Sequence, residues 1–279
     1  MRNMKQTKIT IMAFVKKHRW SWVGLAFVLV GLVIAGVLNL STGCANGKAK
    51  DEGQIPEKPP EPPAVLQSAE LKYEVDGKPR RGLVNYWSNS INRPYLLHFP
   101  DERGLDSWFR KESEKYARMG YTVVTPDFSS ITQRSWDKDV LAQISAATAA
   151  ALTLTRSGPA PKTGVMGFGP GGTYALTAAR YMKFDAAVIC YGELIPREEA
   201  LLDLAEPILG IYGGSDALIP MTSIVAFQEA MQRTGGRFTG QVWQNEGHDF
   251  LRSPRNPDSV QEANLEIVGW LDRYLLPPG

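Results

Sequence analysis

The chain has 279 residues, of which 43% are hydrophobic and 22% are charged, so it can form a packed core and cannot be wholly disordered. Its net charge is +2, and much of the basic excess precedes residue 20. No later basic stripe is interleaved with aromatic residues, which argues against nucleic acid as a partner. The two cysteines, Cys44 and Cys190, provide no disulfide framework, and no Cys/His cluster has metal-ligand spacing. We therefore expect no metal and no cofactor.

The first predicted element is a membrane anchor. Residues 20–40 are uncharged and about as long as the roughly 20 residues needed to cross a bilayer. The basic segment 1–19 precedes them, so the positive-inside rule keeps this segment in the cytoplasm. We predict an N-terminal transmembrane helix, with the rest of the chain on the extracytoplasmic side, in the periplasm or at the cell surface. A buried core helix is the alternative.

The anchor is followed by a candidate lipidation site and a linker. The sequence LSTGC at 40–44 resembles a bacterial lipoprotein box, although Ser41 stands where such boxes prefer leucine. Lipidation of Cys44 and an uncleaved signal anchor are both open, and both attach the protein to a membrane. Segment 41–67 is rich in proline, lysine and glutamate and cannot bury enough apolar surface to order itself. We interpret it as a semi-rigid tether, with a proline-motif ligand for another protein as the alternative.

A folded domain is predicted over 68–279. Asp76 and Gly77 indicate a hairpin turn between LKYEV and RGLVNYW. The first helix has Ser107 as a candidate N-cap and Gly120 beyond its end. Strands are expected at 94–99, 121–127, 163–167, 184–192, 206–214 and 237–244, and helices at 107–120, 137–156, 171–183, 220–234 and 258–275. Apolar strands that alternate with helices imply a mostly parallel sheet with helices on both faces.

Three polar or glycine-rich segments follow strands of this predicted sheet. They are GFGPGG after 163–167, GGSDALIP with Asp216, and NEGHDF with His248. The carboxyl ends of parallel strands are where chemistry gathers in such folds, so we expect these segments to lie together. His98 lies inside a predicted strand and is expected to be a half-buried, hydrogen-bonded residue. Cys190 is expected to be a small core residue.

The order and contexts of these segments resemble the dienelactone hydrolase family, which has the α/β-hydrolase fold. The family's turn between strand and helix reads Gly-x-Cys-x-Gly-Gly, with cysteine as the nucleophile. Its acid lies in a Gly-x-x-Asp-x-x-x-Pro segment that matches Asp216, and its Gly-His-x-Phe segment matches His248. The resemblance covers roughly 80–275, and the matching turn, called the elbow below, consists of Gly167, Phe168, Gly169, Pro170, Gly171 and Gly172.

The resemblance also implies an acidic residue after the early strand, which helps to control the nucleophile. Asp101 and Glu102 are both candidates for that place and for the lining of a pocket.

The elbow of this chain departs from the family pattern at two successive residues. Gly169 stands at the nucleophile position, where glycine keeps the turn without steric cost but supplies no attacking atom. Pro170 follows, and in this fold the N–H of that residue donates to the developing oxyanion. Proline has no N–H, and loss of one such donor typically lowers the rate about 100–1000-fold. Proline also suits the first turn of a helix.

Three functions are compatible with this pattern. The first is a membrane-tethered pseudoenzyme that binds a small carbonyl or ester-like ligand or a partner protein. The second is an active carboxylic-ester or lactone hydrolase in which the Asp216–His248 pair activates water, with oxyanion donors from loop amides near 100–105. The third is a structural scaffold outside the membrane. A purely structural role for Asp216 and His248 remains an alternative at each of these positions.

Overall fold

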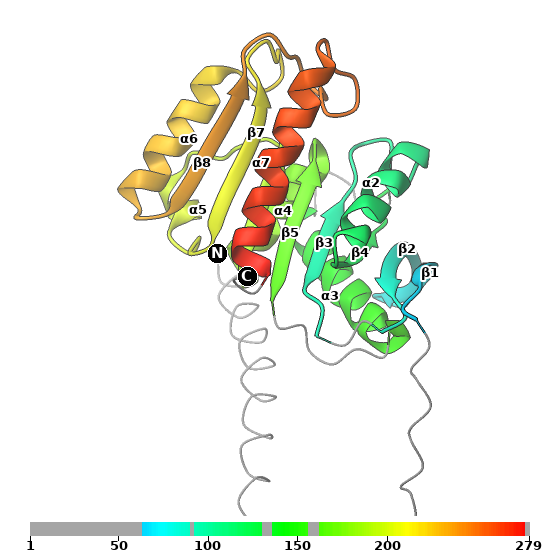
Figure 1. Ribbon diagram of the computed structural model, residues 1–279. Helices are drawn as coiled ribbons and strands as arrows, with labels where there is room; N and C mark the ends of the chain where they lie inside the picture. The colour runs from blue at the N-terminus through cyan, green and yellow to red at the C-terminus, as the bar shows by residue number, and fades with distance from the viewer. Residues whose placement is uncertain (1–62, 90–91, 130–135, 156–161, 277–279) are drawn as a thin grey trace, which may run out of the picture. The chain divides into compact units, whose positions relative to one another are not determined.

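The computed structural model describes residues 63–89, 92–129, 136–155 and 162–276 (Figure 1). The predicted basic segment, the predicted anchor at 20–40 and Cys44 lie outside these ranges. Within them, no helix has the length and apolar character needed to cross a bilayer. The first strand begins at Leu66, two residues before the predicted start of the domain.

The described ranges contain strands and helices in the alternating order that the sequence predicts. Their bounds are β1 (Leu66–Val75), β2 (Lys78–Trp87), β3 (Tyr95–Phe99), α2 (Ser107–Arg118), β4 (Thr122–Pro126), α3 (Trp136–Thr155), β5 (Thr163–Phe168), α4 (Pro170–Tyr181), β6 (Ala186–Cys190), α5 (Glu198–Leu201), β7 (Pro207–Gly213), α6 (Met221–Arg233), β8 (Arg237–Trp243) and α7 (Pro257–Leu275).

The strands form one mixed sheet in the order β1-β2-β4-β3-β5-β6-β7-β8. Asp76 and Gly77 connect β1 to β2 with φ angles of 49° and 72°. A type I′ turn, the common two-residue hairpin connection, requires a positive φ at both positions. β2 is antiparallel to both of its neighbours, and all pairs from β4 to β8 are parallel. The central strands β3 to β7 are buried at every residue except the half-buried Thr163 at the start of β5, which explains their mainly apolar sequences.

Helices cover both faces of the sheet. A side chain at Gly164 of β5 would meet Leu275 of α7, whereas one at Gly167 would meet the backbone of α4. These positions have opposite parity on one strand, so α7 and α4 lie on opposite faces. Figure 1 shows α2 on the same side as α7, with α3 and α4 behind the sheet, and a side-chain hydrogen bond joins α2 to α7.

Two local details differ from the sequence prediction. The N-cap of α2 is Asp106 rather than Ser107, because the Asp106 side chain accepts a hydrogen bond from the N–H of Phe109 (2.9 Å). The prediction also missed α5, which is only four residues long and too short to show helical periodicity. Gly120 does follow the end of α2, with a φ of 107°.

The backbones approach one another most closely at the carboxyl edge of the central strands. A Cβ on Gly167 would lie 2.1 Å from the carbonyl oxygen of Gly171. One on Gly171 would lie 2.3 Å from the carbonyl oxygen of Pro100 and 2.6 Å from that of Phe99. Only glycine fits at these positions, because the obstructing atoms are backbone and cannot turn away as a side chain can.

This packing predicts opposite effects for two glycine substitutions. Gly171→Ala should lower the free energy of unfolding by about 3 kcal/mol or more, because the new methyl group collides with two carbonyl oxygens. Gly269→Ala should raise it by about 0.5–1 kcal/mol, since the position lies inside α7 with no atom within 4 Å of the added Cβ. Urea denaturation of both variants of the full chain measures the difference. Equal stability of the two would contradict the packing described here.

Candidate functional site

The elbow joins β5 to α4 with an unusual backbone conformation. Gly169 has φ 52° and ψ −123°, a left-handed φ that favours glycine. Its N–H donates to the carbonyl oxygen of Cys190 on the neighbouring strand (2.9 Å) and is therefore occupied. Pro170 is the first residue of α4, a position where the missing N–H costs the helix nothing.

The space over Gly169 is bordered by two acidic residues. A Cβ on Gly169 would lie 3.4 Å from Oε2 of Glu102 and 3.7 Å from Cβ of Asp101. Apart from the two residues next to Gly169 in the chain, no other described residue has an atom within 4 Å of that position. The hydroxyl of Thr173 accepts a hydrogen bond from the N–H of Glu193 (2.9 Å). No hydroxyl or thiol of the described residues therefore stands at the place of the missing side chain.

Cys190 is a core residue, as the sequence predicts. It is free and wholly buried, and burial raises the pKa of its thiol well above the usual value. A neutral buried thiol is a poor nucleophile, so Cys190 does not take over the role of an elbow cysteine.

Asp216 and His248 meet although they follow different strands. Oδ2 of Asp216 lies 2.7 Å from Nδ1 of His248. Because a carboxylate can only accept, Nδ1 carries the proton and Nε2 is left free to take one. The Asp216 side chain is completely buried, whereas that of His248 is 27% exposed. This pair can orient an imidazole and move protons.

Asp216 also organises its own loop. Its second oxygen, Oδ1, accepts hydrogen bonds from the N–H groups of Leu218 (2.7 Å) and Ile219 (3.0 Å). The interpretation of Asp216 as a turn residue and its interpretation as the partner of His248 are therefore both supported by contacts.

Glu246 holds the loop that carries His248. It is 1% exposed, and its carboxylate oxygens accept from the N–H groups of Arg255 and Asn256 (both 2.9 Å). Burial alone would raise the pKa of Glu246, but these donors hold it below its usual range. The Glu246 carbonyl also accepts from the N–H of Ser215, next to Asp216 (2.8 Å). Glu246 thus connects the two loops that bring acid and histidine together.

A network of opposite charges connects the loop after β3 to the loop after β8. Arg252 contacts Asp101 (2.8 Å) and Asp106 (2.5 Å), and Arg103 contacts Asp249 (2.7 Å) and Asp101 (3.5 Å). Asp249 directly follows His248, and Asp101 borders the space over Gly169. The network therefore ties the Asp216–His248 side of the site to the elbow side.

Burial and charge act in opposite directions on the carboxylates of this network. Burial raises the pKa of Asp101, and the Arg103 N–H and the Arg252 guanidinium only partly offset it. Burial would also raise the pKa of Asp106, but the hydrogen bond from Arg252 holds it below the usual value. Arg252 lies over the ring of Trp108, 4.2 Å from its centroid, which adds a cation–π contact.

Tyr191 lies beneath the site. Its backbone is strained, with a φ of 41°, and its ring contacts that of His248 edge to face at 5.3 Å. Its buried hydroxyl has no hydrogen-bond partner among the residues that the structure describes. Burial raises the pKa of this hydroxyl well above the usual value, which keeps it protonated.

The prediction for His98 is wrong. The side chain is fully buried, stacked on Phe109 at 4.4 Å, and neither ring nitrogen has a partner within the described ranges. Burial lowers the pKa of His98 well below the usual value, so the ring is neutral. It acts as an aromatic core residue, and the apolar strand around it was the signal for this environment.

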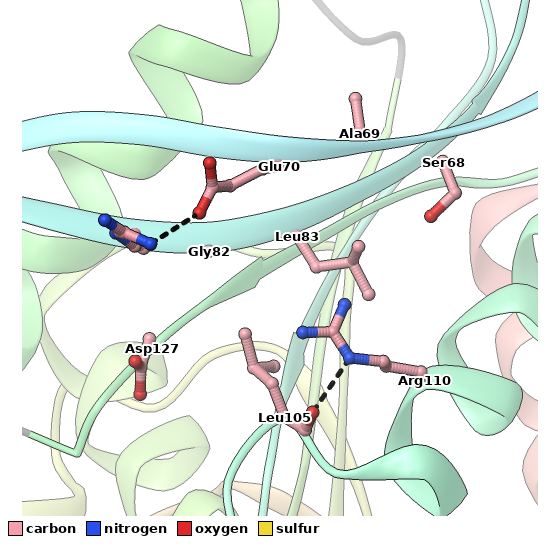
Figure 2. Close-up of a pocket in the computed structure, with 9 residues that line it drawn as sticks. Ser68, Ala69, Glu70, Gly82, Leu83, Leu105, Arg110 and Asp127 are labelled. Atoms are coloured by element: carbon pink, nitrogen blue, oxygen red, sulfur yellow. Dashed lines mark hydrogen bonds and ion pairs between the residues drawn. The ribbon is translucent and has the colours of Figure 1, made fainter.

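One cavity in the described part of the molecule lies away from the elbow. It has a volume of about 380 Å³ and is lined by Ser68, Ala69, Glu70, Arg81, Gly82, Leu83, Leu105, Arg110 and Asp127 (Figure 2). Arg110 donates to the carbonyl oxygen of Leu105 at its border (2.9 Å). None of the predicted site residues lines this cavity, so it is separate from the site built around the elbow.

Comparison with known proteins identifies the family of this chain. The sequence profile of the dienelactone hydrolase family matches residues 82–275. The chain belongs to the dienelactone hydrolase family. The chain is 29% identical over 184 residues to a "Putative carboxymethylenebutenolidase" of Methylorubrum extorquens. The match covers 60% of this chain and 63% of that protein, so this chain spans less than two thirds of the relative's length. It is 27% identical to the human "Carboxymethylenebutenolidase homolog", covering 56% of this chain and 72% of that protein.

Solved structures show the same fold. A crystal structure named "Putative Dienelactone Hydrolase" from Klebsiella pneumoniae superposes with a TM-score of 0.64 at 19% identity, covering 75% of this chain and all of that one. Thermogutta terrifontis esterase 2 superposes with a TM-score of 0.59 at 18% identity, covering 76% and 96%. The described domain of this family member thus has the α/β-hydrolase fold, with a mixed, mostly parallel sheet.

Sequence reasoning missed several residues of the site. Arg103, Arg252 and Asp249 form its charge network, and Glu246 fixes its loops. Each of them follows the end of a strand and lies within four residues of a predicted site residue. That position in the sequence is the signal that could have identified these residues. Within the described ranges no group of three or more His, Cys, Asp or Glu side chains is arranged to hold a metal ion.

Glu246 allows a test of how the site is held. Glu246→Gln should lower the free energy of unfolding at pH 7 by about 3 kcal/mol, because an amide cannot accept both backbone hydrogen bonds and the position is buried. The native pKa is below the ordinary value of about 4.3, so the contribution of Glu246 is complete above that pH and is lost as the pH falls through the native pKa. Chemical denaturation between pH 7 and pH 3 measures both effects.

The matched control is Glu266→Gln on the exposed face of α7, which should change stability by no more than about 0.5 kcal/mol. If the gap between wild type and Glu246→Gln stayed constant down to pH 3, the carboxylate would not be the stabilising species.

Proposed function

We propose that this protein is a dienelactone hydrolase-like pseudoenzyme that binds a small carbonyl or ester-like ligand, or a partner protein, at the elbow. The single observation that carries the proposal is the bare turn at Gly169, where an added Cβ would lie 3.4 Å from Oε2 of Glu102 and 3.7 Å from Cβ of Asp101. A ligand carbonyl above this turn would meet no attacking atom. The proline at position 170 supports the proposal, because it removes the oxyanion donor that this fold normally takes from that residue.

The ligand class follows from the family. The relatives' names denote action on a carboxymethylene-bearing butenolide, a lactone, so a cyclic or open ester is the simplest ligand to infer for a site of the same architecture. The proposed setting is a membrane: the apolar run at 20–40 would anchor the chain, with Cys44 as a lipidation candidate and the domain on the extracytoplasmic side.

A second function is favoured by one contact, the 2.7 Å hydrogen bond between Asp216 and His248. With Nε2 free, His248 could take a proton from water and so hydrolyse an activated ester directly. The oxyanion would need another donor. The N–H of Glu102 lies on the loop after β3, which supplies the second oxyanion donor in this fold.

His248→Ala separates the two functions. We expect the wild-type chain to hydrolyse 4-nitrophenyl acetate and small lactones no faster than the His248→Ala variant, because neither has a nucleophile on the elbow. Initial rates of both proteins, with a protein-free blank, measure this. Wild-type turnover that disappears in His248→Ala would overturn the pseudoenzyme proposal and support water activation by the Asp216–His248 pair.

Restoring the elbow gives a complementary test. Gly169→Cys combined with Pro170→Leu should raise the esterase rate at least about 100-fold over wild type, since it adds a thiol and returns an oxyanion N–H. The matched control is Gly169→Ala with Pro170→Leu, which has the same backbone and no thiol. Both should be less stable than wild type by about 1–3 kcal/mol, because a non-glycine residue is strained at this φ.

Restored activity must also vanish when His248→Ala is added. If the thiol variant is folded and stays inactive, the remaining groups around the elbow are not placed for catalysis.

A further inference from the structure

The cavity away from the elbow lies where the hairpin of β1 and β2 extends beyond the end of β4. Residues 68–70 of β1 and 81–83 of β2 form its strand side, and Asp127 directly follows β4. Leu105, from the loop after β3, and Arg110, from α2, complete the lining (Figure 2). Its volume of about 380 Å³ falls in the range of small-molecule sites, roughly 300–1,000 Å³. The cavity is therefore large enough for a ligand of its own.

The guanidinium of Arg110 is held in place without an anionic partner. Its Nε donates to the carbonyl oxygen of Leu105 (2.9 Å), which leaves Nη1 and Nη2 for a ligand. Figure 2 shows this group between the side chains of Leu83 and Leu105. No carboxylate in the described ranges forms an ion pair with it, whereas Lys115 and Arg118 of the same helix each pair with a glutamate. Two free guanidinium nitrogens side by side match the two oxygens of a carboxylate.

Asp127 adds the opposite charge to the same lining. Its Oδ1 accepts from the N–H of Ser129 (3.0 Å), and its Oδ2 has neither a hydrogen bond nor an ion pair within the part of the chain that the structure describes. Glu70, the other acid of the lining, is paired with Arg81 (3.2 Å) and Lys72 (3.6 Å). One cation and one anion of the lining, on different elements of the fold, are thus left for a ligand.

We propose that this cavity binds a short apolar peptide with free ends, its carboxylate on Arg110 and its ammonium group on Asp127. A ligand with a single charge would leave one of these two residues unpaired, whereas a zwitterion pairs both. The two charges come from α2 and from the end of β4, so a dipeptide, whose charged groups are separated, fits this lining better than a single amino acid. The apolar side chains of the peptide pack on Leu83, which is 3% exposed, and on Leu105. This site is independent of the function proposed for the elbow.

The test uses four matched dipeptides that differ only in their end groups: leucyl-leucine, N-acetyl-leucyl-leucine, leucyl-leucinamide and N-acetyl-leucyl-leucinamide. Ligand-observed NMR titration of the full chain at pH 7 and low ionic strength measures the four dissociation constants. We expect leucyl-leucine to bind about fivefold more tightly than either singly charged peptide, because one more partly exposed ion pair is worth up to about that factor. The neutral peptide should bind most weakly, and the differences should shrink in 0.5 M salt.

Two substitutions assign the charges to the two residues. Arg110→Gln should make leucyl-leucine and leucyl-leucinamide bind equally, because the free carboxylate loses its partner. Asp127→Asn should make leucyl-leucine and N-acetyl-leucyl-leucine bind equally, and an amide oxygen can still accept from the N–H of Ser129. The matched control is Arg118→Gln, on the same helix but not in the lining, which should leave all ratios unchanged. Melting temperatures of the three variants check that the fold is intact.

Three results would overturn this proposal. Singly charged peptides that bind as tightly as leucyl-leucine would show that the two charges are not paired by one ligand. Ratios that do not respond to Arg110→Gln and Asp127→Asn, or that change equally in Arg118→Gln, would place the binding outside this cavity. Absence of binding by all four peptides would show that the cavity is not a peptide site.

Discussion

The site depends on backbone-to-backbone contact at the carboxyl edge of the sheet. The start of α4 lies so close to β5 and to the end of β3 that side chains at Gly167 and Gly171 would overlap carbonyl oxygens. A second contact of this kind lies between the loops after β7 and β8, where a Cβ on Gly213 would lie 2.4 Å from the carbonyl oxygen of Gly247. The first contact gives the elbow its shape, and the second places His248 beside Asp216.

Ion pairs then connect the loop after β3 with the loop after β8, which the glycine contacts hold close to the elbow. Arg103 and Arg252 cross from one loop to the other, and each is linked to a partner 146 positions away in the chain. Because Asp101 is nearly inaccessible to solvent, its pairing with Arg252 both compensates a buried charge and fixes the loop that borders the elbow. One set of contacts thus holds the loop after β3 and the loop after β8 together.

Most of the fold could be predicted because its strands and helices have strong local signals. Buried strands have mainly apolar sequences, and glycine marks the hairpin turn and the elbow. The arginine–carboxylate network could not be predicted, since pairing of long side chains depends on which loops the sheet brings together. Asp106 replaced Ser107 as the N-cap for a similar reason: both residue types can cap, and the choice depends on local backbone geometry. The prediction of a hydrogen-bonded environment for His98 was wrong because the side chain packs against aromatic rings and not against polar groups.

Asp216 and His248 differ in how much the fold itself depends on them. Asp216 would be needed even in a protein without chemistry, because its Oδ1 closes the turn through the N–H groups of two following residues. The described contacts of the His248 side chain are different in kind: the Asp216 carboxylate and the edge of the Tyr191 ring. Neither contact ties the His248 side chain to backbone or closes a loop. Folding alone therefore explains the need for the acid, whereas none of the described contacts of the partly exposed imidazole gives it a comparable role in holding the fold.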